Sequence, residues 1–255
     1  MYTVQMPNDA VALDARTGRE FWKYEHVMRG RQNVCCGRVN RGLAMLGERL
    51  FMGTIDGKLI ALDSRTGAVE WERQLVDPED GYSLTAAPLI VKDKVILGTA
   101  GGEYGIRGWL GAFSPEDGRE IWRFNTIPGP GEPGHETWGG DSWERGGGSI
   151  WLTGSYDPEL NLTYWGVGNP APDWNGDVRP GDNLYTDSVV ALDADTGKLK
   201  WHFQFTPHDL WDFDAVQIPV LVDRPWKGRD RKRMLWGNRN GFFYVLDRAT
   251  GEFLL

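Results

Sequence analysis

The stretch VALDARTGREFWKY, residues 11–24, decides the fold, because versions of it recur along the chain. Related stretches begin at residues 60, 111, 190 and 244 and read IALDSRTGAVEWER, GAFSPEDGREIWRF, VALDADTGKLKWHF and YVLDRATGEFLL. Their fourth residues, Asp14, Asp63, Ser114, Asp193 and Asp247, are 49, 51, 79 and 54 residues apart. The chain is therefore built from a repeated unit, with one longer interval.

Each copy is predicted to be a β-hairpin. An apolar strand leads into an Asp-x-x-Thr-Gly turn, or Ser-Pro-Glu-Asp-Gly in the third copy, in which the first residue caps the turn and Gly supplies a left-handed backbone position. A second strand follows, and in four copies it carries Trp22, Trp71, Trp122 or Trp201. Further strand candidates lie between the copies: RLFMGT (49–54), KVILGTA (94–100), LTYWGVG (162–168) and RMLWGNRNG (233–241).

Four strands in each repeat of about 40 to 50 residues predict an all-β fold, a β-propeller with Trp-docking repeats. The alternative is a β-sandwich with unrelated turns. The hairpin spacing corresponds to roughly four blades. Since an open propeller would expose strand edges and apolar blade faces, we interpret residues 1–255 as one internal, partial propeller domain, truncated at both ends.

Composition narrows the function classes. The 255 residues carry a net charge of -8 and contain 34 Gly, 14 Pro and 13 Trp, which favours short strands joined by tight turns and gives no basic patch for nucleic acid. No apolar run is long enough to span a membrane, and the first residues lack the pattern of a signal peptide. Residues 125–148, rich in Gly and Pro, account for most of the longer interval and predict a functional loop.

Several motifs accompany the repeat in a fixed order: RQNVCCGRVNRG (31–42), GGEYGIRG (101–108), GVGNPAP (166–172), HDLWDFD (208–214) and NRNGFFYVLDRATG (238–251). Together with the Trp hairpins they resemble the quinoprotein alcohol dehydrogenases, which hold pyrroloquinoline quinone (PQQ) on the axis of an eight-bladed propeller. The resemblance covers nearly the whole chain. It implies about half of such a propeller and a PQQ-dependent oxidation of primary alcohols to aldehydes.

The resemblance also implies cofactor contacts. Adjacent Cys35 and Cys36 would form a disulfide over one face of PQQ, while Trp151 would stack on the other. A planar guanidinium at Arg41 suits a cofactor carboxylate. Ala100 stands where some members of the family have a serine that bonds the cofactor. The remaining predicted PQQ residues are Thr85, Gly101, Gly102, Ser149 and Arg239. A disulfide favours the periplasm, whereas two buried free thiols would fit a cytosolic protein.

Four oxygen-bearing residues predict a metal site: Glu103, Asn169, Asp212 and Asp214. They belong to different blades, and such residues meet only near the propeller axis, where converging carboxylates resist ionisation unless a cation offsets them. Oxygen ligands favour a hard ion such as Ca²⁺. In the family, a second Asp two places after the catalytic one is typical of lanthanide enzymes, so Asp214 favours a lanthanide. The alternative is that the acidic pair caps a loop after His208.

The implied mechanism has a metal ion that polarises the quinone, Asp212 as the general base for the alcohol proton, and Arg239 stabilising negative charge on the reduced cofactor. His208 is interpreted as a supporting or loop residue, and His135 has no assigned role. A cytochrome c is the expected electron acceptor, and a homodimer stays open. Two alternatives remain: a calcium-dependent quinoprotein alcohol or sugar dehydrogenase, and a non-catalytic propeller scaffold of the cell envelope.

Overall fold

The repeated stretch forms the predicted hairpins in a computed structural model that describes residues 1–32 and 34–255. In the second copy, the Asp63 Oδ1 atom accepts hydrogen bonds from the backbone N–H groups of Arg65 (3.0 Å) and Thr66 (2.8 Å). Gly67 then adopts a φ of 74°. The turn therefore closes as expected, through the Asp side chain and a left-handed glycine. The hairpin strands are β2 (Asp9–Leu13) with β3 (Glu20–Tyr24), β6 (Lys58–Asp63) with β7 (Val69–Gln74), β10 (Trp109–Phe113) with β11 (Glu120–Asn125), and β14 (Ser188–Asp193) with β15 (Leu199–Gln204).

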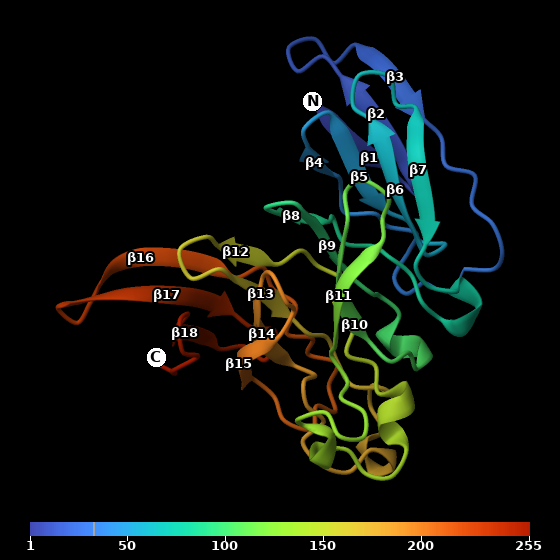
Figure 1. Ribbon diagram of the computed structural model, residues 1–255. Helices are drawn as coiled ribbons and strands as arrows, with labels where there is room; N and C mark the ends of the chain where they lie inside the picture. Colours follow the sequence, from blue (N-terminus) through green and yellow to red (C-terminus); the bar gives the residue numbers. More distant parts are fainter. Residues whose placement is uncertain (33) are drawn as a thin grey trace.

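Each hairpin is part of an antiparallel sheet, and within the described residues the chain forms five sheets in sequence order (Figure 1). Their orders are β1-β2-β3, β4-β5-β6-β7, β8-β9-β10-β11, β12-β13-β14-β15 and β16-β17-β18. The other strands are β1 (Tyr2–Gln5), β4 (Ala44–Leu46), β5 (Arg49–Gly53), β8 (Leu89–Val91), β9 (Lys94–Gly98), β12 (Ser155–Asp157), β13 (Leu162–Gly166), β16 (Val220–Trp226), β17 (Arg229–Gly237) and β18 (Phe243–Asp247). The propeller prediction is confirmed. The spacing had counted roughly four blades, whereas the structure has three four-stranded sheets flanked by two three-stranded ones.

The repeated tryptophans join each sheet to the next. Every one of the four donates its indole N–H to the backbone carbonyl that follows the capping residue of the next hairpin turn. The pairs are Trp22 with Ser64 (3.1 Å), Trp71 with Pro115 (3.1 Å), Trp122 with Ala194 (3.3 Å) and Trp201 with Arg248 (3.1 Å). Each indole also lies against the glycine of that turn, so close that a Cβ there would collide with the ring. The repeat thus encodes both the hairpin and its docking to the next blade.

The core lies between neighbouring sheets. One cluster joins the third and fourth sheets and includes Ile96, Leu110, Trp122, Trp165 and Val190. The inner strands β9, β10 and β13 are buried along their whole length, whereas most residues of the outer strand β7 are exposed. Because blades pack face to face, the inner strands are apolar on both faces, which explains why they read as continuous apolar runs in the sequence.

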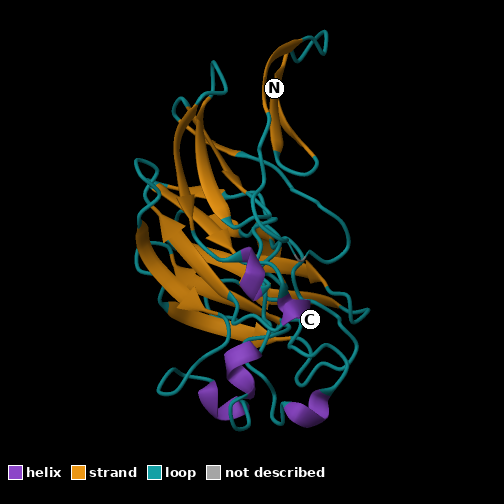
Figure 2. Cartoon of the chain, turned by 90° about the vertical axis from the view of Figure 1, so that its right-hand side faces the viewer, coloured by secondary structure: helices purple, strands orange, loops and turns teal. Residues whose placement is uncertain are grey.

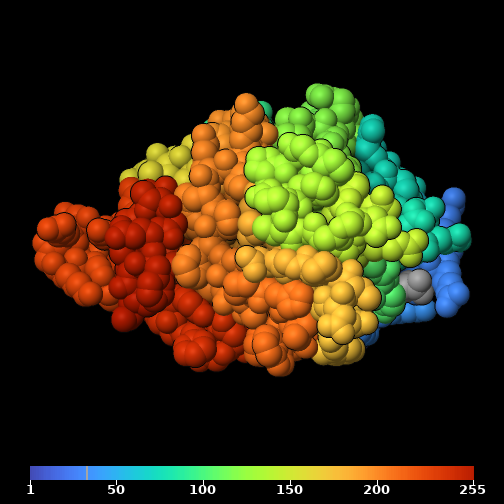
Figure 3. Space-filling model, turned by 90° about the horizontal axis from the view of Figure 1, so that it is seen from below, coloured from blue at the N-terminus to red at the C-terminus, as the bar shows by residue number. Residues whose placement is uncertain are grey.

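Short 3-10 helices occur in the loops between strands: η1 (Pro78–Asp80), η2 (Gly102–Tyr104), η3 (His135–Thr137), η4 (Ser142–Arg145) and η5 (Gly176–Val178). Several of them gather at one end of the sheets (Figure 2). There the Gly- and Pro-rich loop packs against the loop before β14, since Trp138 donates its indole N–H to the Leu184 carbonyl at 2.5 Å. Figure 3 shows the two segments side by side on the surface. Across the described ranges, no helix has the length and apolar character needed to cross a membrane.

Candidate functional site

Loops from successive sheets enclose a cavity of about 390 Å³. Its size is within the range usual for small-molecule sites. All the predicted site residues line it except Gly102, Ser149 and Asn169, which are buried but are not among its lining residues. The lining consists of Val34, Cys35, Cys36, Val39, Arg41, Ser83, Thr85, Ala100, Gly101, Glu103, Trp151, Asp173, Trp174, Asp212, Asp214 and Arg239. The structure therefore brings together residues that are more than two hundred positions apart in the sequence, from Val34 to Arg239.

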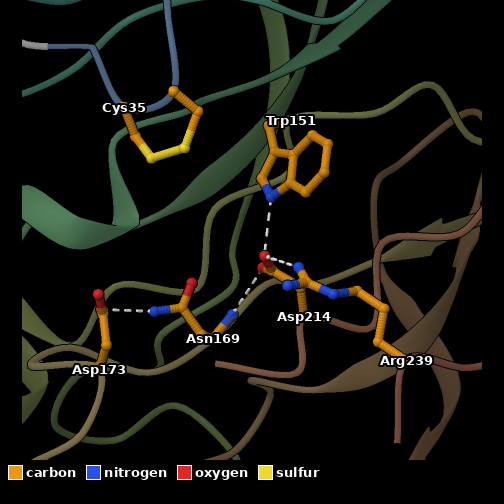
Figure 4. Close-up of a disulfide and its surroundings, with 7 residues drawn as sticks. Cys35, Trp151, Asn169, Asp173, Asp214 and Arg239 are labelled. Atoms are coloured by element: carbon orange, nitrogen blue, oxygen red, sulfur yellow. Dashed lines mark hydrogen bonds and ion pairs between the residues drawn. A yellow bond between two sulfur atoms is a disulfide. The ribbon is translucent and has the colours of Figure 1, made fainter. Parts of the chain in front are cut away.

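One wall of the cavity is the vicinal disulfide. Cys35 and Cys36 are joined with an S–S distance of 2.04 Å, which confirms the predicted pairing. The disulfide and the Trp151 indole border the same space (Figure 4). A flat molecule between them would have a sulfur surface on one side and an aromatic ring on the other.

Trp151 and Arg41 form a second element of the wall. The Arg41 guanidinium carbon lies 4.7 Å from the centre of the indole ring, a cation–π geometry. The Arg41 backbone N–H donates to the Thr85 carbonyl at 3.0 Å, which fixes the loop that carries the arginine. A fixed positive charge thus stands at the cavity edge beside the ring.

Three buried oxygen atoms near the cavity have no hydrogen-bond partner in the described part of the chain: Thr85 Oγ1, Ser149 Oγ and Asn169 Oδ1. Gly102 belongs to the same group, because a Cβ on it would lie 3.2 Å from Ser149 Oγ and 3.3 Å from Asn169 Oδ1. Buried polar atoms are normally paired. These three match a site that a polar ligand or a cation would complete, which is the role the sequence predicts for their residues.

Asp214 is buried at the base of the cavity and is held from three directions. Its Oδ1 accepts hydrogen bonds from the Asn169 backbone N–H (3.1 Å) and the Trp151 indole N–H (3.3 Å), and its Oδ2 pairs with Arg239 Nη1 at 2.7 Å. Burial raises the pKa of Asp214, although these donors act in the opposite direction. Arg239, predicted beside the quinone oxygens, thus contacts a predicted metal ligand (Figure 4).

Asp212 lies two residues earlier at the same wall. Desolvation raises its pKa to about 6, and the neighbouring carboxylates of Asp214 and Asp173 add to this rise. Its backbone adopts a φ of 60°, an uncommon conformation for a residue with a side chain. The loop is fixed by Asp209, whose carboxylate accepts hydrogen bonds from the backbone N–H groups of Trp211 (3.0 Å) and Phe213 (2.9 Å).

Glu103 completes the predicted acidic set from the opposite loop. Partial burial raises its pKa, and the carboxylates of Asp173 and Asp214 contribute further. Within residues 1–32 and 34–255, His, Cys, Asp and Glu side chains alone form no group of three or more arranged to hold a metal ion. A cation here would therefore need other ligands as well, such as the Asn169 amide oxygen and oxygens of a bound molecule.

Asp173 and Trp174 were not predicted. Both Asp173 and Trp174 line the cavity. Asp173 Oδ1 accepts a hydrogen bond from the Asn169 side-chain amide at 2.7 Å (Figure 4). The sequence feature that could have identified Asp173 is its carboxylate, four places after Asn169 in the same loop. Burial raises the pKa of Asp173, although the Asn169 hydrogen bond opposes this. Trp174 is 71% exposed, so its ring borders the mouth of the cavity.

The two histidines considered in the sequence do not line the cavity. His208 Nδ1 is 2.7 Å from the Gly181 carbonyl, and His135 Nδ1 is 3.2 Å from the Pro128 carbonyl. Both contacts connect loop segments, as expected of loop residues. Ala100 lines the cavity with a methyl group where a hydroxyl was considered.

The fold and the site together define a propeller with a cavity bordered by a vicinal disulfide, an indole and several carboxylates. The chain belongs to the glucose/ethanol/alcohol dehydrogenase β-propeller family that uses PQQ, whose model matches residues 1–255. It is 45% identical to quinoprotein alcohol dehydrogenase PedH of Pseudomonas putida over 100% of this chain and 45% of that protein. It is 41% identical to the lanthanide-dependent methanol dehydrogenase of Methylorubrum extorquens, over 98% of this chain and 45% of that protein.

A solved structure is similar to this chain as well. A europium-containing methanol dehydrogenase superposes with a TM-score of 0.91 at 39% identity, over 99% of this chain and 48% of that one. The chain thus spans about half the length of the relatives it matches.

Proposed function

We propose that this chain is part of a PQQ-dependent alcohol dehydrogenase that oxidises primary alcohols to aldehydes. The observation that carries the proposal is the cavity between the Cys35–Cys36 disulfide and the Trp151 indole, with acidic side chains at its base. Membership of the PQQ family and the likeness to named alcohol dehydrogenases support it.

The cavity residues fit a flat, polycarboxylate cofactor. The disulfide would cover one face and Trp151 the other, while the Arg41 guanidinium would pair with a cofactor carboxylate. The unpartnered hydroxyls of Thr85 and Ser149 would bond its polar edge. Gly101 lines the cavity and would approach the cofactor through its backbone. Gly102 does not line the cavity, but it makes room for Ser149 Oγ and Asn169 Oδ1, which a Cβ there would approach to 3.2 and 3.3 Å.

Glu103, Asn169, Asp212 and Asp214 would hold a metal ion beside the cofactor. A lanthanide is the proposed ion, because Asp214 adds a carboxylate and a trivalent cation offsets one more negative charge than Ca²⁺ does. The likeness to a lanthanide-dependent and a europium-containing methanol dehydrogenase favours the same choice. A calcium enzyme of the same family is the second candidate, since the ligands are oxygens that suit either ion.

When bound, PQQ would accept two electrons from the alcohol, and the metal ion would act as a Lewis acid on it. Asp212 would take the hydroxyl proton. Without a bound cation, desolvation and the neighbouring carboxylates raise its pKa to about 6, so its environment supports a carboxylate that can accept a proton. Arg239 would hold Asp214 in place and keep a positive charge beside the reaction centre.

The wider setting is proposed on the same basis. The disulfide favours an oxidising compartment, the periplasm. Electrons would pass to a cytochrome c. Assembly of the protein as a homodimer is a separate prediction. Aromatic side chains in and next to β18 are exposed, among them Phe242 (66%), Phe243 (58%) and Phe253 (55%), which favours coverage by a further blade of a larger propeller.

The test is dye-linked alcohol oxidation by the complete protein, supplied as apo-protein with PQQ and either La³⁺ or Ca²⁺, alongside Asp214→Ala. The proposal predicts activity with La³⁺ that the substitution abolishes. Activity with Ca²⁺ that survives the substitution would favour the calcium enzyme. Absence of PQQ binding with both ions would instead favour a non-catalytic scaffold.

A further inference from the structure

The loop after β13 places one carboxylate at the predicted cation site that the family-based ligand set does not include. Asp173 lines the same cavity as Glu103, Asp212 and Asp214. Its Oδ1 accepts a hydrogen bond from Asn169 Nδ2 at 2.7 Å. The acid is therefore attached directly to a predicted metal ligand.

This hydrogen bond determines which way the Asn169 amide faces. An amide has one donor end and one acceptor end, and a carboxylate can bond only the donor end. With Nδ2 turned to Asp173 and to the Pro170 carbonyl (3.2 Å), Oδ1 must point the other way. Figure 4 shows the Asn169 oxygen directed into the space below the disulfide.

The amide oxygen itself supplies independent evidence of a ligand. Asn169 is completely buried, and its Oδ1 has no hydrogen-bond partner among the described residues. A buried carbonyl oxygen without a donor is costly unless a ligand completes it. A hard cation accepts this kind of oxygen.

We propose that Asp173 is a positioning residue of the cation site, which fixes the Asn169 oxygen toward the ion and adds a fourth carboxylate that favours a trivalent over a divalent ion. The inference rests on the proposed function and names a determinant of metal choice within it. A carboxylate behind a metal ligand orients that ligand and increases its basicity, and its loss commonly weakens metal affinity by about 10- to 100-fold.

The charge effect can be separated from the orientation effect. Asp173→Asn keeps the size of the side chain and an oxygen that can accept from Asn169, but it removes the charge. Coulomb energy scales with the charge of the ion. We therefore expect the logarithm of the affinity loss to be about 1.5 times as large for Eu³⁺ as for Ca²⁺. A loss of about 30-fold for Eu³⁺ would accompany a loss of about 10-fold for Ca²⁺.

Asp173→Ala removes the hydrogen bond as well. The Asn169 amide can then turn away from the ion, and water replaces its oxygen. We expect the Eu³⁺ luminescence lifetimes in H₂O and D₂O to report an additional bound water in this variant and none in Asp173→Asn. Asp177→Asn is the matched control, because this exposed carboxylate belongs to the same loop but does not line the cavity.

The experiment measures Eu³⁺ and Ca²⁺ affinities of the complete protein with PQQ bound, for wild type and the three variants. The expected result is a larger loss for Eu³⁺ than for Ca²⁺ in Asp173→Asn and unchanged affinities in Asp177→Asn. Equal losses for the two ions, or wild-type affinity in Asp173→Asn, would overturn the inference while leaving the proposed function intact. A wild-type protein that binds PQQ with neither ion would overturn the proposed function and the inference with it.

Discussion

Replacement of Gly197 by alanine tests whether tryptophan docking holds the blades together. Gly197 closes the β14–β15 turn with a φ of 68°, and a Cβ on it would lie 2.4 Å from the Trp122 ring. Alanine in a left-handed position costs about 1 kcal/mol or more. Overpacking against a buried ring adds about 1 to 3 kcal/mol, and displacement of Trp122 would weaken its bond to the Ala194 carbonyl by about 1 kcal/mol.

Gly18 gives a matched control within the same motif. Its φ is 73°, and a Cβ on it would meet no atom within 4 Å. Gly18→Ala therefore incurs only the backbone cost, about 1 kcal/mol, whereas Gly197→Ala should cost about 3 to 5 kcal/mol. Gly47→Ala provides a second control, at a φ of 60° in an open turn between β4 and β5.

The assay is equilibrium urea unfolding of the complete protein, followed by tryptophan fluorescence and far-UV circular dichroism. The expected result is a clear drop in midpoint for Gly197→Ala and small drops for both controls. Equal destabilisation by Gly197→Ala and Gly18→Ala would refute the docking explanation, because it would leave the backbone conformation as the only cost.

Three further predictions concern other buried contacts. Asp157→Asn should lower the free energy of unfolding by about 3 kcal/mol in chemical denaturation, because it breaks a 2.7 Å ion pair with Arg248 in which both side chains are almost fully buried. Acid should destabilise the fold between about pH 4 and pH 2. The group responsible is Asp56: burial alone would raise its pKa, but hydrogen bonds and the charge of His26 lower it to about 2. Stability from this carboxylate is therefore complete above its unfolded pKa and is lost as pH falls through the folded value, and Asp56→Asn should flatten that part of the pH–stability curve. Cys36→Ser should weaken PQQ affinity about tenfold in a binding titration while the circular dichroism spectrum stays unchanged, since one preorganised wall of the cavity is lost.

The fold was predictable because its determinants are local and repeated. Asp63 and Gly67 specify a turn within a few residues, and Trp22 recurs at a fixed offset, so the hairpins and their docking can both be read from one repeat. The number of sheets was harder to count. The first strands of the two end sheets, β1 and β16, carry no repeated signature, and the long loop after β11 interrupts the spacing.

The predicted site residues converge on one region, ten of them lining the cavity, yet their contacts could not be predicted. The ion pair between Arg239 and Asp214 joins loops that are 25 residues apart and depends on how two blades meet. Asp173 was missed because a single acid in a loop is usually solvated, and only the structure places it on the Asn169 amide. Asp209 was missed for the same reason, although it fixes the backbone that carries Asp212 and Asp214.

The most direct test of the central claim is a crystal structure of the complete protein with PQQ and La³⁺, with the ion located by anomalous scattering. The account predicts PQQ between the Cys35–Cys36 disulfide and Trp151, and La³⁺ bound by Glu103, Asn169 and the aspartates of the 208–214 loop. Electron density for PQQ outside this cavity, or an anomalous peak remote from these side chains, would contradict it.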